Sequence, residues 1–261
     1  MQNPPPGFSQ YPRGNQGTGY IPLQGPGVHF NLFSKAWEVV KANATVFVLG
    51  FIVVGIIAGF FSLPANLLQN YLAYGSLTDT SPKNLNPVGL IIGTFITSIV
   101  GLITSCLYYG ISSAAVEYAE TGNVQFESIF RGVKHIGQII IFGLIYGFGV
   151  AIGLVFCIIP GLVIATALAF APMAIIHENL NAVEAIQVTW ERTKPHIAAL
   201  IAFNLIGGLI IFIGALLCLV GLLATIPIYY VAVGLQYREL RGPVMVAGNQ
   251  REFNSQVPPT L

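Results

Sequence analysis

Charge is what this sequence lacks most. Asp, Glu, Lys and Arg make up 8% of its 261 residues, whereas a typical soluble domain carries about 25%. A water-soluble fold of this size could not cover its surface with so few charges, and 54% of the residues are hydrophobic. The composition therefore indicates an integral membrane protein. The net charge of +1 argues against nucleic acid as a partner, because that would need a concentrated basic face.

Cysteine is scarce too, and the residues that usually carry chemistry are not grouped. Cys106, Cys157 and Cys218 all lie inside apolar runs, and an odd number of such cysteines predicts no disulfide framework. The four histidines have no Cys or Asp cluster around them. The sequence contains no glycine-rich phosphate loop, no nucleophile motif and no carboxylate pair inside an apolar run. We therefore expect no catalytic site, no metal site and no cofactor.

Long apolar runs are what the sequence does contain. A membrane-spanning helix needs about 20 apolar residues. The motifs "IIPG" (Ile158–Gly161) and "LVG" (Leu219–Gly221) suit tight turns between antiparallel helices. The sequence predicts an all-α integral membrane domain over 28–241, with six transmembrane helices arranged as three hairpins. The predicted spans are 45–64, 88–116, 137–158, 161–177, 197–218 and 220–236.

The placement of the basic residues predicts the orientation. With six spans, both termini lie on one side of the membrane, together with the loops around 117–136 and 178–196. Ten of the eleven Lys and Arg residues fall on that side, and only Lys83, in the 66–87 loop, falls on the other. This asymmetry is typical of cytoplasmic loops. We therefore expect a multi-pass protein of the cytoplasmic membrane with both termini in the cytoplasm.

The two ends of the chain differ in amino-acid composition from the apolar domain between them. Residues 1–27 hold six prolines and six glycines, a composition that cannot offset its ordering entropy by burying apolar surface. We predict that this cytoplasmic tail and a second one, 242–261, are disordered. The motif "PPPGF" within the first tail suits an aromatic groove of a protein partner. A plain tail remains the favoured interpretation of that motif.

A short pattern precedes each of the three predicted hairpins. It reads "WEVVK", "FRGVK" and "WERTK" in the three places, and each copy lies on an amphipathic segment whose apolar face includes the aromatic residue. In the third segment, Asn181 and Glu184 form a capping-box pattern. We interpret these segments as helices in the membrane interface. The anchoring residues are Trp37, Lys41, Phe130, Lys134, Trp190 and Lys194.

An alternative interpretation is that these segments are the ends of tilted spans, but their polar faces are too polar to enter hydrocarbon. The predicted unit is therefore an interfacial helix, a span, a turn and a second span, repeated three times.

A transport path through the membrane is the second functional possibility. The predicted spans contain no ionisable residue deep in the membrane, which argues against an ion-coupled transporter. Asn204 is the most polar group deep in a span. Pro172 and Pro227 interrupt the fourth and sixth spans at comparable places, as in the broken helices of some transporters. These features also fit ordinary helix kinks, which is the explanation we favour.

The stretch "FCIIPGLVIATALAFAPMAIIHENLNAVEAIQVTWERTKPHIAALIAFNLI" resembles a broad family of bacterial integral membrane proteins. That family includes the membrane domain found beside some glycerophosphodiester phosphodiesterase catalytic domains. The resemblance extends over about 30–240 and implies a six-helix bundle with interfacial helices and no established activity. No segment matches the phosphodiesterase barrel itself.

Together these observations favour a non-catalytic scaffold or accessory protein. We expect it to organise lipid or partner proteins at the inner leaflet. An exporter-like protein for a hydrophobic or lipid-like solute is the alternative, and a membrane-bound enzyme comes third.

Overall fold

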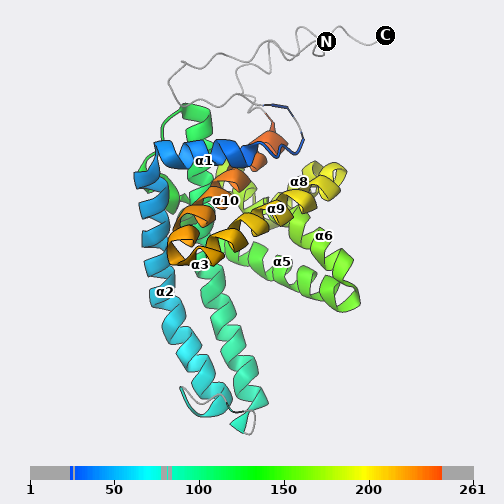
Figure 1. Cartoon of the computed structure of the whole chain (residues 1–261). Coiled ribbons are helices and arrows are strands. Elements are labelled where there is room, and N and C mark those ends of the chain that lie inside the picture. Colours follow the sequence, from blue (N-terminus) through cyan, green and yellow to red (C-terminus); the bar gives the residue numbers. More distant parts are fainter. Residues whose placement is uncertain (1–23, 26, 78–80, 82–83, 243–261) are drawn as a thin grey trace, which may run out of the picture.

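The computed structural model describes residues 24–25, 27–77, 81 and 84–242, with the side chains of 218–220 left out. The described residues form helices and contain no strand (Figure 1). In chain order the elements are α1 (Leu32–Ala42), α2 (Ala44–Tyr74), α3 (Pro87–Thr121), η2 (Phe126–Phe130), α4 (Arg131–Lys134), α5 (Ile136–Phe156), α6 (Ile158–Leu168), α7 (Ala171–Glu178), α8 (Ala182–Thr193), η3 (Lys194–His196), α9 (Ile197–Leu216) and α10 (Cys218–Arg241).

Within the described part of the chain, five helical stretches are long and apolar enough to cross a membrane. They are Ala44–Tyr74, Pro87–Thr121, Ile136–Phe156, Ile158–Glu178 and Ala182–Leu216. The expectation of an all-helical, multi-pass membrane protein is confirmed at this level. The count of six spans stays a prediction, because α10 is not among the five stretches found within the described residues.

The first hairpin is longer than the sequence predicted. α2 continues past residue 64 to Tyr74 with Pro64 inside it, so the expected 66–87 loop shortens to 75–86. Gly75 ends α2 with a φ of +69°, a left-handed conformation that glycine adopts without strain. On the other side of the loop, the side chain of Asn86 accepts hydrogen bonds from the backbone N–H groups of the first turn of α3. The end of α2 and the start of α3 are therefore both capped where they border the loop.

The turns of the other two hairpins come earlier than predicted. Cys157 separates α5 from α6, so "IIPG" lies in the first turn of α6. A proline is tolerated there because the first N–H groups of a helix lack intrahelical partners. Leu217 separates α9 from α10. The fourth predicted span is two helices, since α6 ends at Leu168 and α7 begins at Ala171.

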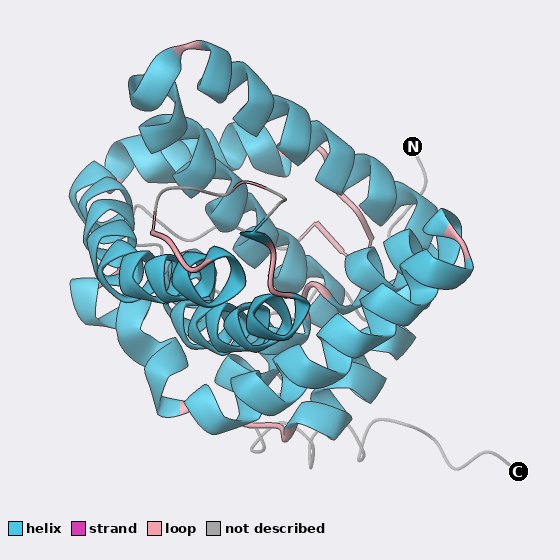
Figure 2. Cartoon of the chain, turned by 90° about the horizontal axis from the view of Figure 1, so that it is seen from below, coloured by secondary structure: helices cyan, strands magenta, loops and turns pink. Residues whose placement is uncertain are grey.

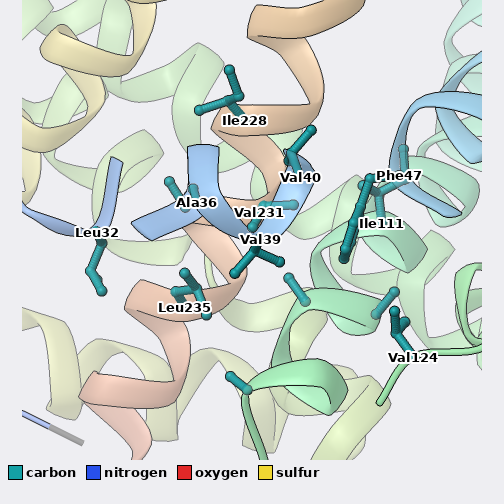
Figure 3. Packing of buried hydrophobic residues seen from close by; sticks show 14 of the residues in the cluster. Leu32, Ala36, Val39, Val40, Phe47, Ile111, Val124, Ile228, Val231 and Leu235 are labelled. Carbon is teal, nitrogen blue, oxygen red and sulfur yellow. The ribbon is translucent and has the colours of Figure 1, made fainter. Parts of the chain in front are cut away.

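The buried core gathers at one end of the bundle, where α3, α7, α10 and α1 meet. Side chains of α1, among them Ala36 and Val39, lie beside Val231 of α10 (Figure 3). Backbones approach closely at this end. A Cβ atom on Gly234 of α10 would lie 2.2 Å from the carbonyl oxygen of Ser112 in α3. Small residues are needed here because they let membrane helices pack in direct contact.

The N-terminal boundary of the packed region differs slightly from the predicted 28. The backbone N–H of Gln24 donates to Oε2 of Glu239 (2.8 Å), and Nε2 of Gln236 donates to the carbonyl of Gly27 (2.7 Å). The last residues of the expected tail therefore contact α10. The rest of that tail, 1–23, and nearly all of the C-terminal tail, 243–261, lie outside the described residues.

Candidate functional site

Two of the three predicted interfacial segments are regular helices, α1 and α8. The predicted capping box is confirmed at the start of α8, where Asn181 accepts from the N–H of Glu184 and the Glu184 side chain accepts from the N–H of Asn181. Oε1 of Gln138 in α5 accepts from the N–H of Ala182 (2.9 Å), which ties the start of α8 to the second hairpin. The 3₁₀ helix η3, which contains Pro195, follows α8.

The second segment is different. η2 and the four-residue α4 replace the predicted continuous helix, and Gly132 of α4 packs against the backbone of α3. A Cβ atom on Gly132 would lie 2.2 Å from the carbonyl oxygen of Cys106. Phe130 is half-buried and Lys134 is exposed. This segment therefore packs closely against α3 and does not form the continuous helix that was predicted.

Trp37 and Trp190 point away from the bundle. α1 is buried through residues such as Leu32, Ala36 and Val39, while Trp37 is 44% exposed. α8 is buried through small residues including Ala185, while Trp190 is 37% exposed. The aromatic residues therefore do not belong to the faces that pack on the protein, contrary to the predicted grouping. Exposed tryptophan is typical of the membrane–water interface.

Each tryptophan has a basic residue four positions later, which places both on one side of the helix. The Nζ atom of Lys41 lies 5.3 Å from the ring centroid of Trp37, within the range of a cation–π contact. Lys194 forms an ion pair with Glu191 instead. In both places a long basic side chain and an aromatic ring share an exposed surface. That combination suits contact with lipid headgroups, where the ring meets the apolar boundary and the ammonium meets phosphate.

Asn204, Pro172 and Pro227 lie in α9, α7 and α10, and the side chain of Asn204 makes its hydrogen bonds within the protein. Nδ2 of Asn204 donates to the carbonyl of Leu200 (3.1 Å), and Oδ1 accepts from the hydroxyl of Tyr229 (2.9 Å). The amide is thus used for packing α9 against α10. Pro172 lies in the first turn of α7, after a break, whereas Pro227 lies inside the continuous α10. The two prolines do not interrupt their spans in the same way, which corrects the expected equivalence.

The structure shows an ionic cluster that the sequence reasoning missed. NH1 and NH2 of Arg192 donate to the two carboxylate oxygens of Glu178 at 2.5 and 2.9 Å, which is a bidentate pair. The hydroxyl of Tyr237 also donates to Glu178 (2.5 Å). These contacts join the end of α7 to α8 and α10. The cluster therefore fixes α8 to the buried end of the bundle.

A second ion pair has the same spacing. Arg131 lies 3.0 Å from Glu117, fourteen residues before it, and Arg192 is likewise fourteen residues after Glu178. The Glu178–Arg192 pair lies 61 positions after the Glu117–Arg131 pair in the sequence. A 61-residue offset aligns Arg131 with Arg192, whereas the motifs "FRGVK" and "WERTK" align at an offset of 60 residues. The 61-residue spacing of the two Glu–Arg pairs is the sequence signal that could have revealed the cluster.

Ser113 and His177 form the contact that most resembles catalytic machinery. The Oγ atom of Ser113 lies 3.0 Å from Nε2 of His177. Ser113 is fully buried in α3, so a substrate carbonyl has no access to its hydroxyl. A nucleophile must be reachable by the reacting atom as well as paired with a base. Within the described residues, no group of three or more His, Cys, Asp or Glu side chains is arranged to hold a metal ion.

The comparisons with known proteins give distant likenesses. No family model matches the chain, and no solved structure matches it. Uncharacterised proteins of Mycobacterium tuberculosis and Mycobacterium bovis are each 25% identical to it over 140 residues. The alignment covers 54% of this chain and 43% of each relative, so the chain matches less than half the length of these proteins. The likeness shows a relationship without supplying an activity.

Proposed function

We propose that this protein is a non-catalytic scaffold or accessory protein that organises lipid or partner proteins at the inner leaflet of the cytoplasmic membrane. Its six membrane-embedded helices form three hairpins, each preceded by an interfacial segment. Both ends of the chain lie in the cytoplasm. The ten basic residues on one side support this orientation. The resemblance to membrane domains found beside glycerophosphodiester phosphodiesterases fits the same role.

One observation carries the proposal, namely that α1 and α8 present Trp37 and Trp190 outward while their opposite faces are buried. Exposed aromatic side chains also occur along the spanning helices, as at Phe60 and Phe61 of α2, but these two have no basic residue beside them. α1 and α8 instead expose an aromatic ring beside a basic residue. An exposed surface of that kind is suited to the boundary between headgroups and acyl chains.

The ionic cluster supports a structural role for this end of the bundle. The Glu117–Arg131 and Glu178–Arg192 pairs join the end of one hairpin to the segment that precedes the next. Such pairs hold the interfacial segments at a defined position on the bundle. Their equal spacing supports the proposed repeat of one unit along the chain. The proline-rich tail, 1–27, is the proposed contact for a protein partner.

The test is purification of the intact protein in lipid nanodiscs, with the bound lipids identified by native mass spectrometry. The double variant Trp37→Ala, Trp190→Ala is compared with a matched control, Phe60→Ala, which removes an exposed aromatic residue from the middle of α2. We expect the double variant to lose retained lipid while the control keeps it. Equal retention in both variants would count against the scaffold role.

Two further measurements separate protein partners and transport from lipid binding. Crosslinking followed by mass spectrometry, with and without residues 1–23, tests the tail as the contact for a defined protein. Movement of labelled lipid between the leaflets of reconstituted vesicles tests the alternative function. If the protein moves lipid and Asn204→Leu abolishes the movement, the transport proposal replaces the scaffold.

A further inference from the structure

Polar residues mark the place where a helical hairpin meets water on the far side of a membrane. The α2–α3 hairpin has such residues at its far end. Asn66 lies in the last turns of α2, and Nε2 of Gln69 donates to Oγ1 of Thr94 in α3 (3.0 Å). The connecting loop, 75–86, contains Ser, Thr, Asp, Lys and Asn. This hairpin is built to leave the hydrocarbon and end in an aqueous environment.

The α5–α6 and α9–α10 hairpins have no such end. Residues 147–165 and 205–224 contain neither a charged side chain nor an amide, hydroxyl or imidazole group. Both segments include the turn of their hairpin and many residues on either side of it. Phe156, next to the first turn, is 83% exposed, and Leu216, next to the second, is 70% exposed. Neither segment contains the Trp, Tyr, Lys or Arg residues that usually anchor a helix end in headgroups.

The backbone at both turns is also suited to a non-aqueous environment. In hydrocarbon, a backbone N–H or C=O without a partner is costly, so exposed irregular loops do not occur there. The N–H of Cys157 donates to the carbonyl of Gly153 (2.9 Å), and Pro160, in the first turn of α6, has no N–H. The N–H of Leu217 donates to the carbonyl of Ile213 (3.2 Å). Each turn is one residue long, so the backbone groups left without intrahelical partners are those of the two helix ends, with no additional loop between them.

The three hairpins also differ in direction and reach. α2 and α3, with 31 and 35 residues, extend roughly 46 and 52 Å at 1.5 Å per residue. The hydrocarbon core of a bilayer is about 30 Å thick. The α2–α3 hairpin extends furthest from α1, while the other two hairpins diverge from it (Figure 1). Seen from below, one helix pair is viewed nearly end-on, and other helices lie across the view (Figure 2).

The tilt of α5 and α9 from the bilayer normal decides how deep they reach, because these helices have only 21 and 20 residues. Each is about as long as the hydrocarbon is thick, so it reaches the far side only when it stands upright. An inclined hairpin of this length ends inside the hydrocarbon.

We infer that α5–α6 and α9–α10 are re-entrant hairpins, which enter the bilayer from the side of α1 and α8 and end among the acyl chains. Only α2–α3 then reaches water on the far side. The distribution of basic residues is the same for both arrangements, because a re-entrant hairpin returns the chain to its starting side just as two crossings do. The inference does not rest on the scaffold role. It implies that the protein occupies more volume in one leaflet than in the other.

The native cysteines provide the test, since Cys157 and position 218 lie at the two turns. One protein keeps Cys157 and carries Cys218→Ala, a second keeps Cys218 and carries Cys157→Ala, and both retain the fully buried Cys106. The matched control carries Leu77→Cys, in the α2–α3 loop, with both turn cysteines replaced by alanine. The protein with alanine at both turns and no added cysteine measures any labelling of Cys106.

Each full-length protein is reconstituted in vesicles, nitroxide-labelled, and examined by power saturation with oxygen and with a water-soluble nickel chelate. We expect both turn positions to collide several-fold more with oxygen than with the chelate, and Leu77→Cys to show the reverse. An impermeant maleimide applied from the far side should modify Leu77→Cys and spare both turns. Modification of the turns at the rate of Leu77→Cys would overturn the inference. Shielding of the turns from both oxygen and chelate would also overturn it, because a protein interface would then cover them.

Discussion

The close backbone contact at Gly110 allows the sharpest test of the packing. Gly110 lies in the buried half of α3, and a Cβ atom there would be 1.6 Å from the carbonyl oxygen of Ile129 in η2. The obstructing atom belongs to the backbone, so no side-chain rotation can relieve the overlap. Gly110→Ala must therefore push η2 away from α3. Gly101→Ala, in the same helix, is the matched control, because a Cβ atom there meets nothing within 4 Å.

The expected difference between the two variants follows from two opposing effects. Overpacking a close contact costs about 1–3 kcal/mol and sometimes more. Replacing glycine by alanine within a helix gains up to about 1 kcal/mol. Gly101→Ala should therefore leave the free energy of unfolding unchanged or raise it slightly. The free energy of unfolding of Gly110→Ala should be about 2 kcal/mol or more lower than that of Gly101→Ala. For a chain of this size, the melting temperatures should differ by roughly 5 °C or more.

The assay is thermal unfolding of the purified proteins in one detergent, followed by circular dichroism and by the loss of monodisperse protein on gel filtration. A Gly110→Ala protein that melts with or above Gly101→Ala would refute the contact between α3 and η2. The wider account of a core held by close backbone approach at this end of the bundle would then be wrong as well.

Five further substitutions test three separate parts of the structure. Glu178→Gln removes the negative charge from a partly buried bidentate pair. It should lower the free energy of unfolding by about 2 kcal/mol, less than the loss for a fully buried pair, and thermal unfolding measures the change. Glu191→Gln, at a 63% exposed side chain, should cost less than about 0.5 kcal/mol. Phe156→Lys should impair membrane insertion by about 3 kcal/mol if its turn lies near the bilayer centre, whereas Leu77→Lys should insert normally. Asn204→Leu leaves a tyrosine hydroxyl without its acceptor and should cost about 1–2 kcal/mol in unfolding.

Features set by neighbouring residues could be predicted from the sequence. The capping box of Asn181 and Glu184 depends on a four-residue pattern, and the structure contains it. The helical, membrane-spanning character follows from the apolar runs, which are long enough to identify by composition alone. Element ends were less predictable. Hydropathy falls at Asn66 and Gln69, yet α2 continues to Tyr74 because capping and a side-chain contact with α3 support the extra turns.

Features that depend on distant parts of the chain could not be predicted. The outward direction of Trp37 follows from the contact of α1 with α10, about 200 residues later in the sequence, since that contact decides which face of α1 is buried. The second interfacial segment fails to form a regular helix because η2 and α4 fit closely against α3 at Gly110 and Gly132. The pairing of Glu178 with Arg192 depends on how α7 and α8 meet.

The most direct test of the central claim uses the native fluorescence of the protein, because its two tryptophans are Trp37 and Trp190. The protein is reconstituted with lipids brominated at different depths along the acyl chain, and quenching is compared between depths. We predict that bromines close to the headgroup quench most strongly and that those near the bilayer centre quench least, because both rings lie at the interface. Strongest quenching by the deepest bromines, or none at any depth, would contradict the placement of α1 and α8 on the membrane surface.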